Sequence, residues 1–276
     1  MPMPPSEKRA RAEAGAVRRV AKDGPLIISI HVPKTAGSRF GEILKARYGD
    51  ALAYYYGPNN PKTHPLARVR PKDLDADLFD RLHASGVRIL HGHMRANLLM
   101  RSVPDHSRYW VWLREPIEQV ISYYHFVRTS KGDGGPLYQA VQEQGISLDE
   151  FVTLPQITNV QTQYCGPLQL EKAGFVGVTE QFSRMLPLIG LRDQQRWSNV
   201  NAEKPMADRD TRTAIARQMT DDVGLYSYAL ELSIRRLGIR DTRLQSLYRR
   251  WQGLVGRPVA ERIAAPARPL EPEEPR

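Results

Sequence analysis

The stretch Leu26–Tyr48, LIISIHVPKTAGSRFGEILKARY, carries the strongest fold signal in this chain. Its first five residues, 26–30, form an apolar run rich in β-branched side chains, which is typical of a short buried strand. Residues 31–37 interrupt the run with a proline and a glycine. From Ser38 onward, apolar side chains recur at helical spacing and predict one buried helix face. The stretch therefore predicts a strand, a tight loop and a helix in direct succession.

Such a loop directs unpaired backbone N–H groups and the positive end of a helix dipole at one place, where an anion can bind. Lys34 adds a positive charge to the loop, and Thr35 and Ser38 add hydroxyl donors. The same residues are compatible with an ordinary strand–helix turn that contains a lysine. Because strand, lysine, glycine, hydroxyls and helix follow one another in this order, we predict phosphate binding at the loop.

Three more apolar runs have the character of buried strands; they lie at 87–90, 109–113 and 175–178. Helical patterns separate them, and the clearest one begins at Pro116, a residue suited to the first turn of a helix. From Thr211 onward the pattern is helical, with apolar stripes at 225–232 and 244–251. We therefore predict an α/β fold: a P-loop-like parallel sheet that helices flank on both faces, with a helical C-terminal part.

One domain is expected over residues 25–265. Residues 1–24 are basic, and 266–276 are rich in proline and charge, so a disordered arm and a disordered tail are predicted. Residues 49–72 contain four prolines and are expected to be an irregular surface excursion. A short helix is expected at 74–83.

A second helix start is indicated by the spacing of Ser147 and Glu150, which predicts a capping box.

Composition excludes several classes of protein. The chain has 276 residues, 41% of them hydrophobic, so it can bury the core of a globular enzyme. Its single cysteine, Cys165, excludes an internal disulfide and a cysteine-rich zinc site and fits a reducing compartment. No run approaches the roughly 18 apolar residues that span a bilayer, and no secretory signal is visible, so we expect a cytoplasmic protein. The net charge of +10 favours an anionic ligand, although a solvated basic surface explains it equally well.

Polar residues follow the strands predicted at 26–30, 87–90 and 109–113. Because ligands bind beyond the carboxyl ends of parallel strands, these polar segments should converge at one site. Arg114 can fold along the following helix, about 9 Å over six residues, and meet the Ser122 hydroxyl at one phosphate. Their spacing alone fits two solvent-facing side chains as well.

The histidines His91 and His93 lie two residues apart on an extended segment and so share a face. A histidine beside a phosphate site can act as a general base at neutral pH. One of the pair can instead be structural, and no third ligand nearby supports a metal site.

The motifs resemble those of sulfotransferases that use 3′-phosphoadenosine 5′-phosphosulfate (PAPS). The segment 31–40, HVPKTAGSRF, is similar to their 5′-phosphosulfate loop, and 113–126, LREPIEQVISYYHF, is similar to their 3′-phosphate motif. With His-Gly-His between the two, the order resembles the branch that contains heparan sulfate 2-O-sulfotransferase and related carbohydrate sulfotransferases. Looser matches lie at 159–162, 175–180 and 199–204.

The resemblance implies a metal-independent transfer of sulfate from PAPS to a carbohydrate hydroxyl, with His93 as catalytic base and His91 assisting. The donor-binding residues that it implies are Lys34, Thr35, Ala36, Gly37 and Ser38 for the phosphosulfate, Arg114 and Ser122 for the 3′-phosphate, and Lys204 as a further contact. Lys34 would also assist catalysis. Glu115 departs from the aspartate that is usual at its position, and the membrane anchor of the Golgi relatives is absent.

Two other functions stay open on the sequence. A P-loop nucleotide kinase would need magnesium, but Lys34 comes early in its loop and no apolar strand ends in an aspartate. A non-catalytic binder of acidic glycans or nucleic acid would fit the charge, but aromatic and basic residues are not interleaved as in RNA-binding modules, so no nucleic-acid partner is expected. The acceptor, whether acidic or neutral, and the oligomeric state are not specified by the sequence.

Overall fold

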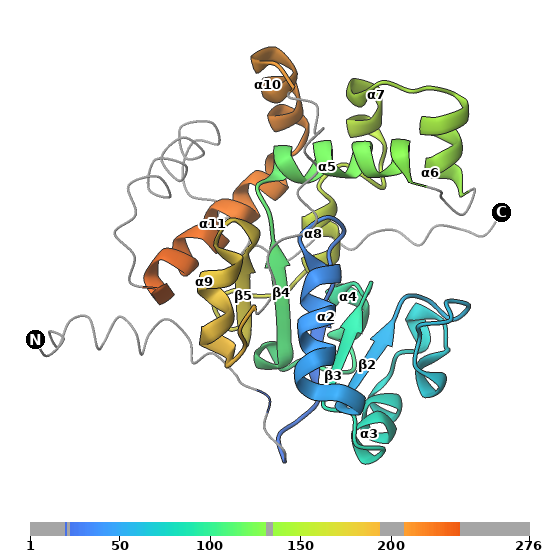
Figure 1. Ribbon diagram of the computed structural model, residues 1–276, viewed down its shortest axis with the longest axis vertical. Helices are drawn as coiled ribbons and strands as arrows, with labels where there is room; N and C mark the ends of the chain where they lie inside the picture. The colour runs from blue at the N-terminus through green and yellow to red at the C-terminus, as the bar shows by residue number, and fades with distance from the viewer. Residues whose placement is uncertain (1–19, 21–22, 131–134, 194–206, 238–276) are drawn as a thin grey trace, which may run out of the picture.

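The computed structural model describes residues 20, 23–130, 135–193 and 207–237. It shows an α/β fold in which helices lie on both faces of a parallel sheet (Figure 1). The five strands are β1 (Ile27–Ile30), β2 (Leu52–Tyr55), β3 (Ile89–Gly92), β4 (Tyr109–Leu113) and β5 (Phe175–Val178). They are ordered β2-β3-β1-β4-β5, and every neighbouring pair runs parallel. The predicted α/β class with a parallel sheet is confirmed.

Strand β2 corrects the prediction for residues 49–72. Leu52–Tyr55 pairs with β3, and the irregular excursion begins only after it. The strand has four residues and lies at the edge of the sheet, so its pattern is too short to stand out beside the prolines that follow. Strand β3 also begins and ends two residues later than predicted, because His91 and Gly92 belong to it.

The longer helices begin and end close to the predicted positions. Helix α2 (Gly37–Tyr48) follows β1, α3 (Ala76–Ala84) precedes β3, and α5 (Pro116–Thr129) follows β4. The other α-helices in the described ranges are α4 (Ala96–Leu99), α6 (Pro136–Tyr138), α7 (Leu148–Thr153), α8 (Val160–Cys165), α9 (Phe182–Met185), α10 (Arg209–Gln218) and α11 (Thr220–Leu237). The capping box predicted from Ser147 and Glu150 is present at the start of α7.

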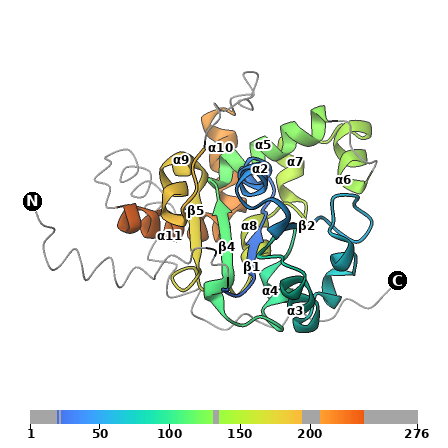
Figure 2. The same ribbon diagram turned by 60° about the horizontal axis from the view of Figure 1, so that its bottom comes forward.

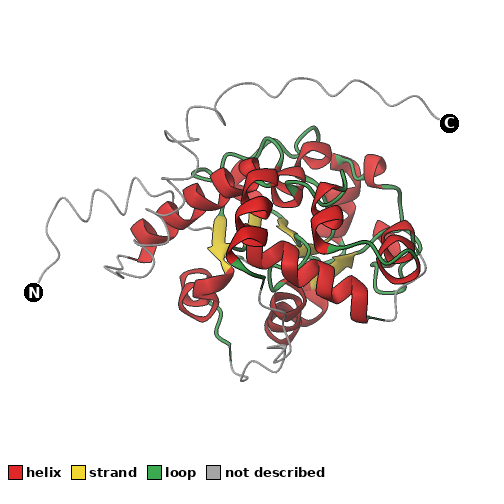
Figure 3. Cartoon of the chain, turned by 90° about the horizontal axis from the view of Figure 1, so that it is seen from above, coloured by secondary structure: helices red, strands yellow, loops and turns green. Residues whose placement is uncertain are grey.

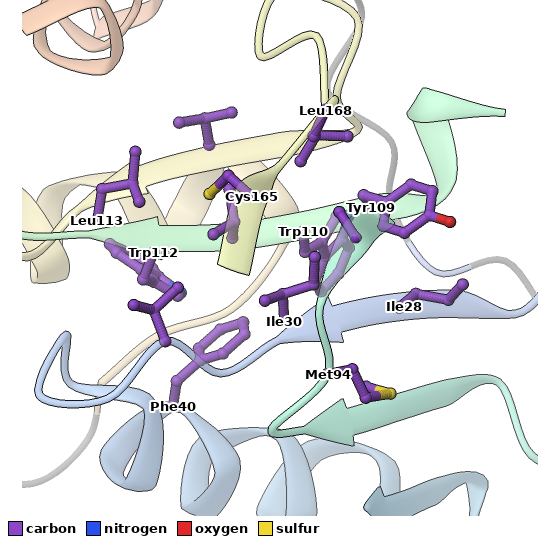
Figure 4. Close-up of a cluster of buried hydrophobic side chains, with 14 of the residues drawn as sticks. Ile28, Ile30, Phe40, Met94, Tyr109, Trp110, Trp112, Leu113, Cys165 and Leu168 are labelled. Carbon is purple, nitrogen blue, oxygen red and sulfur yellow. The ribbon is translucent and has the colours of Figure 1, made fainter. Parts of the chain in front are cut away.

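Helices on both sides of the sheet bury its side chains. Phe40 of α2 packs on Trp112 on one side of β4, with ring centroids 5.5 Å apart. Leu113 points to the other side, where Cys165 of α8 lies (Figure 4). Seen from above, helices surround the strands (Figure 3). The Cys165 thiol is fully buried, which raises its pKa and makes it a packing residue.

The strand order places two loops side by side. Strand β1 lies between β3 and β4, both of which follow it in the chain. Ile30, its last residue, is in register with Gly92 on one side and Val111 on the other. The starts of α2 and α5 therefore meet above the carboxyl ends of β1 and β4 (Figure 2). Ligands of open α/β sheets bind at such a point.

Several predictions fall outside the described residues. These are most of the basic arm at 1–24, the tail at 266–276, the apolar stripe at 244–251 and the segment 199–204 with Lys204. Among the described helices, none is long and apolar enough to cross a membrane.

Candidate active site

The loop after β1 has an unusual backbone. Lys34 and Ala36 have φ values of +64° and +66°, a region that L-residues other than glycine rarely adopt. Thr35 lies between them and is buried, with its hydroxyl donating to the Val32 carbonyl at 2.9 Å. Alternation of left-handed and ordinary conformations gathers backbone N–H groups around a concavity that suits an anion. Each strained residue costs about 1–3 kcal/mol, and such strain is concentrated at functional sites.

The N-terminus of α2 opens onto the same loop. Ala36 occupies the cap position and offers no side-chain hydrogen bond, and the first turn contains no acidic residue. Ser38 is exposed in this first turn. The first N–H groups of a twelve-residue helix and its dipole therefore face the loop without a negative partner from the helix itself.

Two cations flank the loop. The Arg114 guanidinium donates from Nη1 to the Lys34 carbonyl at 3.1 Å, and the Lys34 ammonium lies 4.1 Å from the centre of the Phe126 ring. Burial lowers the pKa of both groups, and Arg114 lowers that of Lys34 further. Within the described residues, neither cation forms an ion pair with a carboxylate. The carboxylates of Glu180 and Glu115 raise the pKa of Arg114 from farther away than an ion pair. Two neighbouring, partly buried cations with no ion-paired carboxylate in the described residues favour the binding of an anion.

Arg114 is held through its backbone. Its N–H donates to Gln161 Oε1 and its carbonyl accepts from Gln161 Nε2, both at 2.9 Å. Gln161 is completely buried, so this pair of bonds is shielded from water. Glu180 accepts from the Glu115 N–H at 3.0 Å and from the Tyr226 hydroxyl at 2.9 Å, which fixes the next residue of the turn. The backbone of Arg114, the candidate phosphate-binding residue, is therefore held in a defined direction after β4.

One face of α5 supports the loop. Gln119 donates to the Pro33 carbonyl at 2.8 Å, and Phe126 lies under the Lys34 ammonium. Ser122 lies three residues after Gln119 and four before Phe126, so the three share a helix face. The structure therefore places Ser122 on the side of α5 that faces the anion loop.

His93 has one ring nitrogen fixed by the backbone and one left open. Its Nδ1 lies 2.8 Å from the His31 carbonyl, which can only accept, so Nδ1 carries the ring proton and Nε2 carries the lone pair. The rings of Tyr56 and Tyr164 meet the His93 ring edge-on, with centroids 5.1 and 6.2 Å away. His93 is exposed as a residue, yet its ring packs against protein on the His31 side. This desolvation lowers the pKa of the His93 imidazole from its ordinary value, which favours the neutral ring.

His91 occupies a different position and has the contacts of the structural histidine that the sequence left open for one of the pair. It is only 1% exposed, and both of its nitrogens are bonded within the protein. The Ser29 hydroxyl donates to Nδ1 at 2.9 Å, and Nε2 donates to the Gly37 carbonyl at 3.1 Å. Burial lowers its pKa to about 4. His91 therefore has no nitrogen left for a substrate, and it holds the start of α2 in place.

The structure thus brings the loop residues 34–38, Arg114, the Ser122 face of α5 and His93 to one end of the sheet. Sequence reasoning missed the residues that support them, which are His31, Gln119, Gln161 and Glu180. Gln161 and Glu180 lie in the looser matches at 159–162 and 175–180, which were the available signal.

Comparison with known proteins adds no relative: no family model matches the chain, and no match was found among curated proteins or solved structures. We therefore base the function on the geometry of this site and on the motifs of the sequence.

Proposed function

We propose that the protein is a sulfotransferase that moves the sulfuryl group of PAPS to a carbohydrate hydroxyl. One observation carries the proposal: an anion loop flanked by two cations, neither of them ion-paired to a carboxylate in the described part of the chain, lies next to a histidine with an open Nε2 lone pair. A kinase-type site would need only the first half of this arrangement. A simple anion binder would not need the histidine.

The chain offers groups for both ends of the donor. The loop N–H groups, Lys34 and the Ser38 hydroxyl would hold the 5′-phosphosulfate, in the manner of a P-loop. Arg114 and Ser122 would hold the 3′-phosphate, because both face the loop from the β4–α5 side. Guanidinium groups suit this task, since they form two parallel hydrogen bonds to a phosphate.

The transfer itself follows from these positions. His93 Nε2 removes the proton of the acceptor hydroxyl, whose oxygen forms a bond to sulfur as the bond from sulfur to the 5′-phosphate oxygen breaks. The products are a sulfate ester and adenosine 3′,5′-bisphosphate, and the proton leaves from His93 to water. Lys34 and the loop N–H groups stabilise the charge on the leaving phosphate. This positive charge takes the place that a metal ion holds in phosphoryl transfer.

The surroundings of His93 support a sugar as acceptor. Two tyrosine rings stand beside the histidine, and the Arg95 guanidinium lies 5.8 Å from the centre of the Tyr164 ring. Aromatic faces pack on the apolar faces of sugar rings, and an exposed arginine suits an acidic substituent. The proposed acceptor is therefore a carbohydrate, which can be acidic. The proposed compartment is the cytoplasm, as expected from the sequence.

The deciding experiment is transfer of radiolabelled sulfate from PAPS to a panel of glycans, lipids and small phenols. We expect labelled glycans with wild type, without added metal. His93→Ala should lower kcat by about 10²–10⁴-fold and leave the binding of adenosine 3′,5′-bisphosphate within about two-fold. His64→Ala, in the excursion after β2, serves as the matched control. Tight bisphosphate binding without transfer to any acceptor would favour a binder, and a strict magnesium requirement would favour a kinase.

The pH dependence of kcat gives a second test. Protonation of His93 removes the lone pair, and burial lowers its pKa from the ordinary imidazole value, so kcat should be constant at neutral pH and fall only at acidic pH. An acid limb centred above pH 7 would contradict His93 as the base.

A further inference from the structure

Three histidine rings are stacked beside the anion loop. The His31 ring lies 4.4 Å from the His93 ring and 5.2 Å from the His91 ring, centre to centre, at interplanar angles of 26° and 15°. His31 immediately follows β1 and is only 7% exposed, whereas His91 lies in β3 and His93 directly follows that strand. The general base of the proposed reaction thus rests on a ring that comes from a different strand.

His31 also touches the anion loop. A Cβ added to Gly37 would lie 1.9 Å from His31 Cδ2 and 2.2 Å from Nε2, so the edge of the ring lies directly on the Gly37 Cα. The φ angle of Gly37 is not in the left-handed region, so its backbone conformation does not require glycine. The His31 ring does require it, because the ring occupies the space of a Cβ. His31 fills the space between the loop and His93, and neither can move toward the other without displacing it.

The third contact of His31 is with Tyr56, whose hydroxyl lies 3.2 Å from His31 Nδ1 and can hydrogen-bond either tautomer of the ring. Burial, followed by the neighbouring His93, His91 and Lys34, lowers the pKa of His31 to about 2. The ring is therefore a neutral spacer at every pH at which the enzyme can work.

We propose that His31 is a positioning residue, which holds His93 at a fixed distance from the anion loop and keeps Nδ1–H of His93 on the His31 carbonyl. The proposal rests on the proposed function, because it assigns a task to His31 in the same reaction. The carbonyl selects the nitrogen that carries the proton, and the ring face prevents the His93 ring from turning away. Nε2 of His93 then points outward in a single orientation.

The test measures the His93 tautomer directly, by ¹⁵N chemical shifts of the full-length protein labelled at histidine. Wild type should show a protonated Nδ1 and an unprotonated Nε2 at His93. In His31→Ala the spacer is missing, so we expect mixed tautomers and a kcat about 10–100-fold lower, with the KM for PAPS within about two-fold. His31→Phe retains a flat ring and should recover most of the kcat. Tyr56→Phe, which removes only the hydroxyl contact, is the matched control and should cost less than His31→Ala.

A variant with His31 unchanged guards against a simple folding defect. Gly37→Ala places a Cβ where the His31 ring lies, so it should shift the His93 tautomer in the same direction as His31→Ala. In the His31→Ala background the space is vacant, and Gly37→Ala should add little to the change in tautomer. A single His93 tautomer in His31→Ala, or additive effects of the two substitutions, would overturn the proposal. If the tautomer responds as expected but wild type transfers no sulfate, the proposed function fails and the positioning stands.

Discussion

Helices α2 and α8 begin in the same way and differ in what meets their first N–H groups. Each is entered through a non-glycine residue in the left-handed region, Ala36 before α2 and Asn159 before α8. At α8 the Asp222 carboxylate accepts from the N–H groups of Gln161 and Thr162, at 3.0 and 2.7 Å. At α2, within the described residues, no side chain caps the helix, and the Lys34 and Arg114 cations flank the loop that leads into it. The carboxylates of Glu42 and Asp193 are bound by Arg39 in the first turn and do not cap the helix.

The comparison shows what an occupied helix start looks like in this protein. Asp222 is buried, which raises the pKa of its carboxyl to about 6, yet two N–H donors and the helix dipole meet it at α8. At α2 the donors and the dipole are present and no carboxylate is supplied by the helix. The start of α2 therefore has the features of an anion site whose anion comes from outside the chain.

The largest effect is expected at the open helix start. Lys34→Ala should lower the rate of sulfate transfer about 10³-fold, because one charge facing the leaving phosphate is lost in a partly dry site. The Lys45→Ala variant, at the far end of α2, should retain near-normal turnover. Steady-state kinetics with PAPS measures both, and equal activities would remove the loop from the mechanism.

At the start of α8, which the Asp222 carboxylate occupies, a substitution should affect the stability of the protein. Asp222→Ala leaves two buried N–H groups without a partner and should lower the free energy of unfolding by about 2–4 kcal/mol. Asp222→Asn retains one acceptor oxygen and should cost less. Urea unfolding at pH 8 compares the three proteins. If Asp222→Ala unfolds at the wild-type midpoint, the α8 N–H groups do not depend on this carboxylate.

Arg114 joins the two regions, since Gln161 of α8 holds its backbone and the Lys34 carbonyl, in the loop before α2, accepts from its side chain. Arg114→Ala should weaken the binding of adenosine 3′,5′-bisphosphate by about 2–3 kcal/mol, the value of a charge-assisted hydrogen bond. Adenosine 5′-monophosphate lacks the 3′-phosphate and should lose much less. Calorimetric titration of both nucleotides measures the difference, and equal losses would show that Arg114 does not read the 3′-phosphate.

The smallest change in stability is expected when a carboxylate is added at the start of α2, so that it resembles the start of α8. Ser38→Asp adds a carboxylate to the first turn of α2 and should stabilise the fold by about 0.3–1 kcal/mol. The same carboxylate should exclude the bisphosphate, so binding should be lost as stability rises. Ser38→Asn adds a similar volume without the charge and should keep most of the binding. Unchanged affinity in Ser38→Asp would place the anion elsewhere.

Local patterns in the sequence predict part of this site. The strand, loop and helix at 26–48 are predictable because apolar periodicity and a few loop residues lie next to one another. The anion loop could therefore be predicted together with Arg114 and His93, each at the end of a strand. The different environments of His91 and His93 could not be predicted. The burial of His91 depends on contacts with Ser29 and Gly37, which lie 62 and 54 residues away in the chain.

Contacts between distant segments explain the other misses. Gln161 and Arg114 lie 47 residues apart in the chain. A hydrogen bond between a side-chain amide and a distant backbone group leaves no periodic pattern in the sequence, so it could not be predicted. His31 was visible in the loop, but its stacking on His93 depends on the register of β1 with β3. Strand β2 depends on the same pairing, because four residues at an edge acquire a strand conformation only beside β3.

The reciprocal contact of α8 with α11 has a consequence for biosynthesis. Asp222 caps α8, while the Asn159 side chain accepts from the N–H groups of Asp221 and Asp222 at the start of α11. A helix of six residues is not stable alone in water, so α8 forms only when α11 docks. On the ribosome, the nascent chain can pair all five strands before Asp222 emerges, yet Gln161 is not held at that stage. The sheet can therefore be complete before Arg114 is fixed, and the candidate site is assembled only when α11 has been made.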